Sequence, residues 1–318
     1  MRKRLQNIVA ESGLTLPIVA LYTGIVWLLA GMATHHWWIQ FAVLEVSAYL
    51  FVEMNNSNAL IRVRNRMVGS TFLVISSAPC FMFESLSGSL FMLCILISLL
   101  FLFQSYQEEE NARPIFYGYL FIGLASLIWI DILYFVPLLW ILNYSLLQSL
   151  SIRTWMASVI GLVTPYWFPT PWVFFQRAFE PLANHLSALT DFQFPIPILS
   201  LSIGQILPFI LTLIIALTGI IHFLLKSYED RIRIRMLYLF FAWTGLFTTA
   251  FLLFQPQHYD YLMRILIICA CPFVAHFFTL THSKLSNSFF VVVIVLFLLT
   301  TVANLMAPYI PAIQESIQ

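Results

Sequence analysis

The sequence predicts an all-α, polytopic integral membrane protein. Of its 318 residues, 61% are hydrophobic and only 9% are charged, whereas a soluble domain carries about 25% charged residues because its surface faces water. The apolar residues form runs of about 20, the length that crosses a bilayer core of about 30 Å as a helix. The 15 Lys and Arg residues are also unevenly divided between alternate connecting segments, which is typical of multi-pass membrane proteins.

Each expected span is delimited by charges, Pro, Asn or Gly, because backbone in lipid must be helical and polar groups collect at helix ends. Eleven spans result. The fifth and sixth are short and meet at Asp131, so residues 115–149 form either two tilted spans or a hairpin that does not fully cross. The expected spans are residues 14–33, 38–54, 67–83, 88–105, 115–130, 132–149, 154–175, 203–225, 236–254, 264–282 and 288–307.

The distribution of basic residues predicts the orientation. With a cytoplasmic N-terminus, only Arg177 and Arg264 fall in outer loops, and the remaining 13 of the 15 basic residues fall in cytoplasmic segments. Cytoplasmic segments retain positive charge, so we expect the N-terminus inside and, after an odd number of spans, the C-terminus outside. No small-residue cleavage site precedes His35, which favours an uncleaved first span. Residues 1–318 are expected to form a single transmembrane domain in a bacterial inner membrane.

The longest connecting stretch, residues 176–202, is predicted to lie outside. Between 176 and 191, apolar residues recur every three or four positions opposite a polar face, the pattern of an amphipathic helix lying in the membrane interface. The apolar face consists of Phe175, just before this stretch, and of Phe179, Leu182, Leu186 and Leu189. The polar face consists of Arg177, Glu180, Asn184 and His185.

Composition and motifs exclude several functions. The net charge of +1 gives no basic surplus for binding nucleic acid. The sequence contains no nucleophile elbow, Walker loop, His-Glu-x-x-His or paired Cys-x-x-Cys, so we expect neither a cofactor nor a metal site. The four cysteines lie in apolar runs, where free Cys packs as a small hydrophobe.

Few ionisable residues remain as candidates. Glu45 lies near the middle of the second expected span, and it either marks a polar pathway or is a protonated carboxyl hydrogen-bonded to a neighbouring helix. On the predicted outer face, Glu84 and Asp131 are candidate acids, and Arg177 and Arg264 are candidate phosphate ligands because they depart from the charge bias. Alternatively Arg264 pairs with Asp260, four residues earlier, if the tenth span begins that early.

Residues 58–175 contain three features of a known family. The basic segment Arg62–Arg66 leads into a span that ends at the acidic turn Phe83–Gly88; a small-residue span at Gly118–Ser126 leads to Asp131 and Pro137; and a third segment runs from Arg153 to Pro165. Together they resemble the middle of the C-type glycosyltransferases, multi-pass enzymes that use polyprenyl-phosphate-linked sugars. The last segment is also similar to uncharacterised bacterial inner-membrane families. The resemblance implies a catalytic acid at the outer face. Glu84 matches the position at which these enzymes often have a second acid.

The sequence differs from that family in its first outer loop, and this difference leaves more than one functional interpretation open. Those enzymes carry a catalytic acid in a long first outer loop, whereas here that loop is only residues 34–40 and contains no acid. Either the base has moved, to Glu84 or Asp131, or transferase activity has been lost. We therefore expect an enzyme that handles a polyprenyl-linked sugar, or a structural subunit of a cell-envelope complex, or a transporter with Glu45 on its path. Expected partners are membrane lipids, a polyprenyl-phosphate-linked glycan or other envelope proteins.

Overall fold

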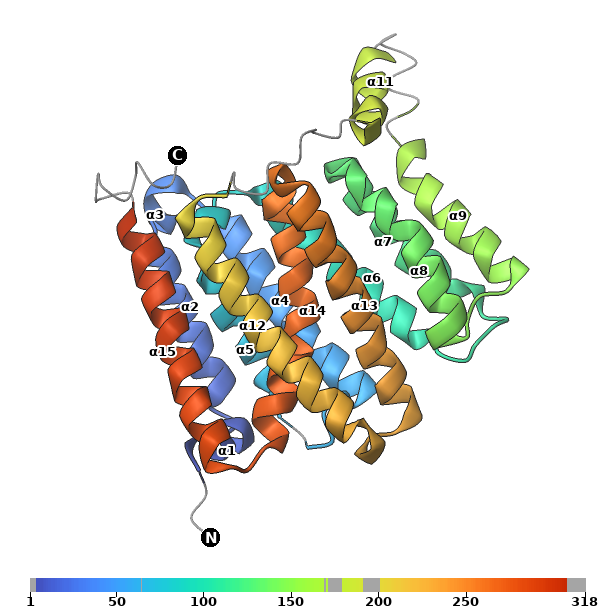
Figure 1. Cartoon of the computed structure of the whole chain (residues 1–318). Coiled ribbons are helices and arrows are strands. Elements are labelled where there is room, and N and C mark those ends of the chain that lie inside the picture. Colours follow the sequence, from blue (N-terminus) through green and yellow to red (C-terminus); the bar gives the residue numbers. More distant parts are fainter. Residues whose placement is uncertain (1–3, 64, 169, 171–178, 191–200, 308–318) are drawn as a thin grey trace. The chain divides into compact units, whose positions relative to one another are not determined.

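The computed structural model describes residues 4–63, 65–168, 170, 179–190 and 201–307. All secondary-structure elements within these ranges are helices, which confirms the all-α prediction. A helix begins within or next to each of the eleven expected stretches (Figure 1). The α-helices are α1 (Leu5–Glu11), α2 (Thr15–Leu29), α3 (Met32–His35), α4 (Trp38–Asn58), α5 (Met67–Ser77), α6 (Leu86–Gln104), α7 (Ala112–Ile128), α8 (Phe135–Leu142), α9 (Ile152–Trp167), α11 (Phe179–Ser187), α12 (Ile203–Lys226), α13 (Ile232–Phe254), α14 (Tyr259–Leu280) and α15 (Lys284–Met306).

Six segments among the described residues are long and apolar enough to cross a membrane, and a seventh is formed if α1 and α2, bent by 95°, count as one span. The chain is therefore a multi-pass helical membrane protein. Two other apolar helices, α5 and α7, are shorter than a full crossing. The six segments are Leu86–Gln104, Ile130–Leu147, Ile203–Glu229, Ile232–Phe254, Pro256–Leu280 and Lys284–Met306.

Several helix ends differ from the sequence expectation for local reasons. The third expected span reaches residue 83, but α5 ends at Ser77. Ala78 keeps helical dihedral angles, and the chain leaves the helix at Pro79, whose ψ is 73° and which has no N–H to continue the helical hydrogen bonds. A short 3₁₀ turn, Cys80–Met82, follows. By contrast, α14 begins earlier than expected, at Tyr259 rather than at residue 264. Asp260 therefore lies in its first turn.

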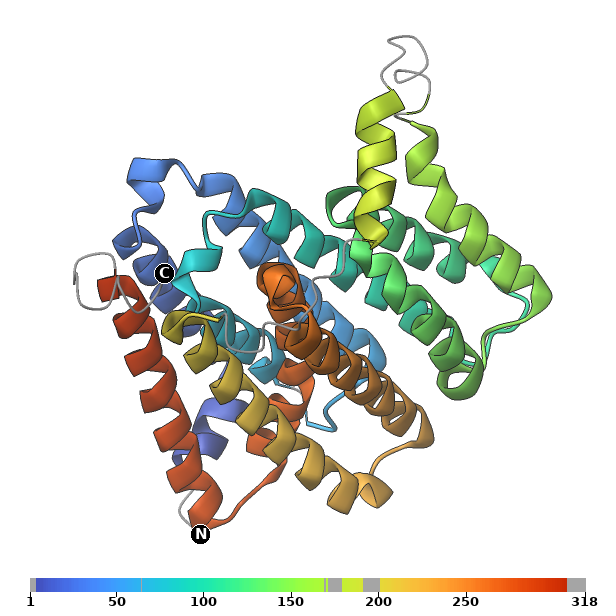
Figure 2. The ribbon, with the colours of Figure 1, turned by 45° about the horizontal axis from the view of Figure 1, so that its top comes forward.

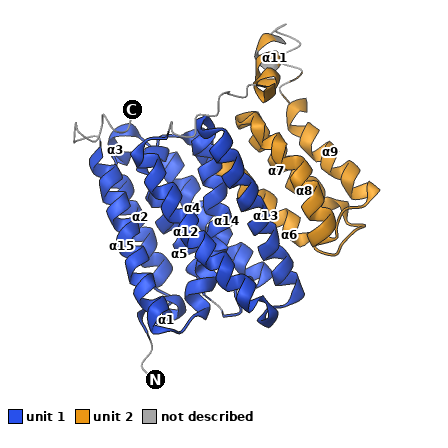
Figure 3. Ribbon diagram, viewed as in Figure 1, with its two compact units in different colours: residues 1–89, 198–318 blue, residues 90–197 orange. Residues whose placement is uncertain are grey.

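The helices group into two compact units, residues 1–89 with 198–318 (unit 1) and residues 90–197 (unit 2) (Figure 3). In unit 1, α14 lies among α5, α12 and α13 (Figures 1 and 2). Its span is 94% buried, so this helix is the core of the unit. Gly219 of α12 permits the approach, because a Cβ there would lie 2.8 Å from the main chain of Phe273.

Unit 2 is organised around the pair α7 and α9, which pack closely along their length. A Cβ at Gly161 would lie 2.6 Å from the carbonyl oxygen of Phe116, and one at Gly123 would lie 2.6 Å from that of Leu162. Small residues that let two backbones touch are the usual means of helix association in membranes. The 3₁₀ turn Ile130–Tyr134 then connects α7 to α8.

The N-terminal helix α1 was not expected from the sequence. Its polar side faces the connection between α14 and α15, where Gln6 donates to the hydroxyl of Ser286 at 3.0 Å and Asn7 lies 2.9 Å from a ring nitrogen of His282. Its apolar residues Leu5 and Ile8 are exposed. We name the two ends of unit 1 after the short helices that lie there, the α1 end and the α3 end (Figure 1).

Candidate functional site

A buried ion pair occupies the α3 end of unit 1, on the predicted outer side. Arg264 contacts Oδ1 of Asp260 through Nε at 3.1 Å and through a terminal nitrogen at 3.0 Å. The same terminal nitrogen donates to the carbonyl oxygen of Met82 at 2.6 Å. The Arg264 side chain is only 7% exposed. Arg264 therefore connects the start of α14 to the chain that precedes α6.

Ser85 links this ion pair to the N-terminus of α6. Its hydroxyl donates to Oδ2 of Asp260 at 2.8 Å and accepts from the backbone N–H of Gly88 at 3.0 Å, which is the geometry of a helix N-cap. A Cβ at Gly88 would lie 2.3 Å from Asp260 Oδ2 and 2.5 Å from Arg264 Nε. Only glycine at this position allows the carboxylate and the guanidinium to approach the helix.

Glu84 lies immediately before this cluster and is exposed. Its backbone carbonyl accepts from the side chain of Gln40, at 3.5 Å, and the adjacent ring of Phe83 stacks on Trp27 at 4.0 Å between centroids. The main chain around Glu84 is thus held on both sides. Its carboxylate is presented at the surface of unit 1.

The geometry of Arg264 favours the pairing alternative over phosphate binding. Its Nε and one terminal nitrogen are directed to Asp260 and to a backbone carbonyl, and little of the side chain is accessible. A phosphate would have to displace these partners. Arg264 thus holds the main chain at Met82, two residues before Glu84.

The other two candidates fall within residues 90–197. Asp131 belongs to unit 2, where it is buried at 6% exposure in the turn after α7. Arg177 lies outside the described residues. In the same connecting stretch, α11 runs from Phe179 to Ser187; its His185 contacts the carbonyl oxygen of Ser126 at 3.0 Å, and Leu186 is exposed. The convergence of all four candidates on one cleft remains a prediction.

Glu45 is half-buried in the middle of α4. Its Oε1 is buried and has no hydrogen-bond partner among the residues that the structure describes. A carboxyl oxygen out of contact with solvent needs a proton, a water or a bound ligand to compensate for lost hydration. The protonated carboxyl and the polar pathway therefore both remain open.

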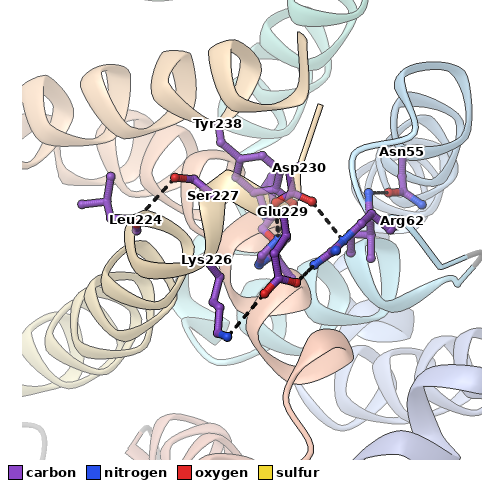
Figure 4. A network of polar contacts seen from close by, with 11 residues as sticks. Asn55, Arg62, Leu224, Lys226, Ser227, Glu229, Asp230 and Tyr238 are labelled. Carbon is purple, nitrogen blue, oxygen red and sulfur yellow. Dashed lines mark hydrogen bonds and ion pairs between the residues drawn. The ribbon is translucent and has the colours of Figure 1, made fainter. Parts of the chain in front are cut away.

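A second polar network lies at the α1 end and was not predicted as a site (Figure 4). Asp230, with a side chain 1% exposed, contacts Nε of Arg62 through Oδ1 at 3.0 Å. Arg62 also binds Glu229 at 2.9 Å, and Glu229 binds Lys226 at 3.3 Å. These ion pairs join the α12–α13 connection to the α4–α5 connection.

Two histidines extend this network into the helical core. His276 of α14 is fully buried, and its Nε2 lies 3.2 Å from Oδ2 of Asp230. The ring of His222 on α12 lies 5.6 Å away between centroids. The Nδ1 atoms of both rings are buried without a hydrogen-bond partner in the described part of the chain. The signal for this site was present in the sequence, since both histidines fall inside apolar stretches.

No family model, curated protein or solved structure matches this chain. The fold defines a multi-pass helical membrane protein, and its function is inferred from its own geometry. Among the described residues, no group of three or more His, Cys, Asp or Glu side chains is arranged to hold a metal ion.

Proposed function

We propose that the chain crosses the bacterial inner membrane eleven times, with its N-terminus in the cytoplasm and its C-terminus outside. A helix in each of the eleven apolar stretches supports this topology. The charge bias supports the orientation, because Arg62 and Lys226 lie together at the α1 end. Arg264, which departs from the bias, is buried and neutralised by Asp260. An ion-paired arginine needs no cytoplasmic location to be tolerated at a helix end.

We propose further that the protein handles a polyprenyl-phosphate-linked sugar at the outer membrane face, on a glycosyltransferase-like scaffold. The observation that carries this proposal is the exposed carboxylate of Glu84 on a main chain fixed by Gln40 and by the cluster of Ser85, Asp260 and Arg264. A general base must be accessible and held in position. Glu84 meets both conditions.

The remaining residues take different roles in this proposal. Arg264 is a positioning residue that fixes the turn carrying Glu84, rather than a phosphate ligand. Arg177 stays the candidate for the phosphate, because a guanidinium can bind it through two parallel hydrogen bonds. Asp131 stays the alternative base, although its burial makes it less accessible than Glu84. In the transfer step the base removes the proton of an acceptor hydroxyl as the sugar leaves its phosphate.

Two measurements test this proposal: sugar transfer in membranes, and identification of the molecules that co-purify with the protein. Membranes containing Glu84→Gln should lose transfer of labelled sugar from a polyprenyl-phosphate sugar, because the amide cannot accept the proton. Glu110→Gln, an exposed acid on the predicted cytoplasmic side, should keep it. Purified protein should also carry polyprenyl lipid detectable by mass spectrometry. Full activity of Glu84→Gln, with protein instead of lipid co-purifying, would favour the accessory subunit, with α11 as its docking surface.

A proton-coupled transporter is the second candidate, and the buried Asp230–His276 contact favours it. His276 lies inside the membrane helix α14, where ionisable groups commonly line ion pathways, and Glu45 adds another such group in unit 1. Proteoliposomes under a pH gradient should then carry a current that Asp230→Asn abolishes and that Glu53→Gln, at an exposed position of α4, leaves intact. No current in the wild-type protein would eliminate this candidate.

A further inference from the structure

Unit 1 contains an apolar cavity that the proposed function does not use. Its volume is about 90 Å³, and nearly all of its lining surface is apolar. Thr15 and Met67, the first residues of α2 and α5, line it together with Phe278, near the end of α14. These three positions place one side of the cavity at the α1 end of the unit.

Helices α2 and α15 form part of the cavity wall. Val19 on α2 and Ile294 on α15 both line it, and both are only half-buried. Toward the α3 end, the hydroxyl of Tyr22 donates to that of Thr301 at 3.2 Å and joins the two helices. At the other end, α1 joins them through its polar contacts with the α14–α15 connection. The two half-buried lining residues lie between these two polar contacts, on helices with exposed apolar side chains.

A basic residue lies at the start of the short helix that contributes Val9 to the cavity lining. Arg4 directly precedes α1, and Val9 of the same short helix lines the cavity. The two residues are about 7.5 Å apart along the helix axis at 1.5 Å per residue. One terminal nitrogen of Arg4 is buried and has no hydrogen-bond partner among the described residues. A buried guanidinium nitrogen without a partner requires an anion or water to compensate for its lost hydration.

We infer that this cavity is a binding site for an anionic glycerophospholipid, with one acyl chain entering between α2 and α15 and the phosphate contacting Arg4. Hydrocarbon is the medium that surrounds these helices, and an unfilled apolar void loses the dispersion contacts of its lining atoms. The position of Arg4 at the α1 end matches a headgroup in the leaflet on that side. This site is independent of the proposed base Glu84, which lies at the α3 end.

Native mass spectrometry of the purified full chain in detergent, with added dioleoyl phosphatidylglycerol or dioleoyl phosphatidylcholine, tests this inference. The wild-type protein should bind the anionic lipid about fivefold more tightly, the equivalent of about 1 kcal/mol for one basic residue near a lipid phosphate. Arg4→Gln should remove this preference while leaving phosphatidylcholine binding unchanged. Lys284→Gln, at an exposed position on the same end, should keep it.

Filling the cavity tests the acyl-chain part. Val19→Trp should weaken binding of both lipids by about tenfold, because the ring occupies the chain's space, whereas Ile18→Trp, on an exposed position of the same helix, should not. Ile294→Trp repeats the test from α15 and guards against misfolding of a single variant, with Val295→Trp, also exposed, as its control. Equal binding in the cavity-filling variants and their controls would overturn the site, and an unchanged lipid preference in Arg4→Gln would overturn the headgroup contact.

Discussion

Arg264 provides a quantitative test of the ion pair at the α3 end. Two opposite charges about 4 Å apart at an effective dielectric constant of 20 attract by about 4 kcal/mol. The Asp260 side chain is 29% exposed while that of Arg264 is 7% exposed, and solvent at the carboxylate screens part of this energy. We therefore expect a coupling free energy of about 2 kcal/mol between the two side chains.

A double-mutant cycle with Asp260→Asn, Arg264→Met and the double variant measures this coupling. Unfolding in mixed micelles with increasing dodecyl sulfate can be followed through the nine tryptophans. Asp260→Asn alone should be the costly change, about 3 kcal/mol, because it leaves a buried guanidinium without its counter-charge. The double variant should recover much of that loss.

The control cycle combines Arg264→Met with Glu53→Gln, an exposed acid on α4, and should be additive. A coupling below about 0.5 kcal/mol between residues 260 and 264 is within the additivity of independent sites, and it would refute the pairing role. The reasoning would also fail if Arg264→Met left stability unchanged but reduced binding of polyprenyl phosphate, because Arg264 would then be a phosphate ligand.

Three other expectations follow from the structure. Alkaline phosphatase fused after Gln318 should be active, whereas activity of a cytoplasmic reporter at that point would invert the proposed orientation. Gly161→Ala should destabilise the protein by about 1–3 kcal/mol in the same micelle assay, because its methyl group would overlap the main chain of α7; Gly13→Ala, with nothing within 4 Å, should be tolerated, and equal effects would contradict the proposed close packing. Asp230→Ala should cost about 3–5 kcal/mol, since its side chain is 1% exposed, while Glu229→Ala, in a solvated ion pair, should have little effect; the reverse order would place the stabilising contact at Glu229.

The all-helical fold was predictable because bilayer thickness sets the length of an apolar run. Helix ends were less predictable where single residues decide them, as at Pro79, which follows the end of α5. The helix α1 was missed because only 7 residues form it, too few for a periodic pattern. Its stabilising contacts come from Ser286 and His282, which are distant in sequence.

The candidate site was also predictable from the sequence only in part. The pairing of Asp260 with Arg264 follows from their spacing on one helix, and the structure confirms it once α14 begins at Tyr259. The contacts of Arg264 with Met82 and of Asp260 with Ser85 join segments far apart in the chain, so no local pattern could reveal them. The Asp230–His276 contact also joins residues far apart in the chain, so it could not be predicted from a local pattern.

Two of the polar contacts that α14 makes limit how unit 1 can move. Arg264 and His276 are twelve positions apart on this helix, about 18 Å along its axis and about 120° around it at 3.6 residues per turn. One is anchored to the chain before α6 and the other to the α12–α13 connection. Translation or rotation of α14 would break both contacts, so we expect this helix to keep its position within unit 1. Any change of shape within unit 1 is then expected at peripheral helices such as α15, whose span is only 28% buried.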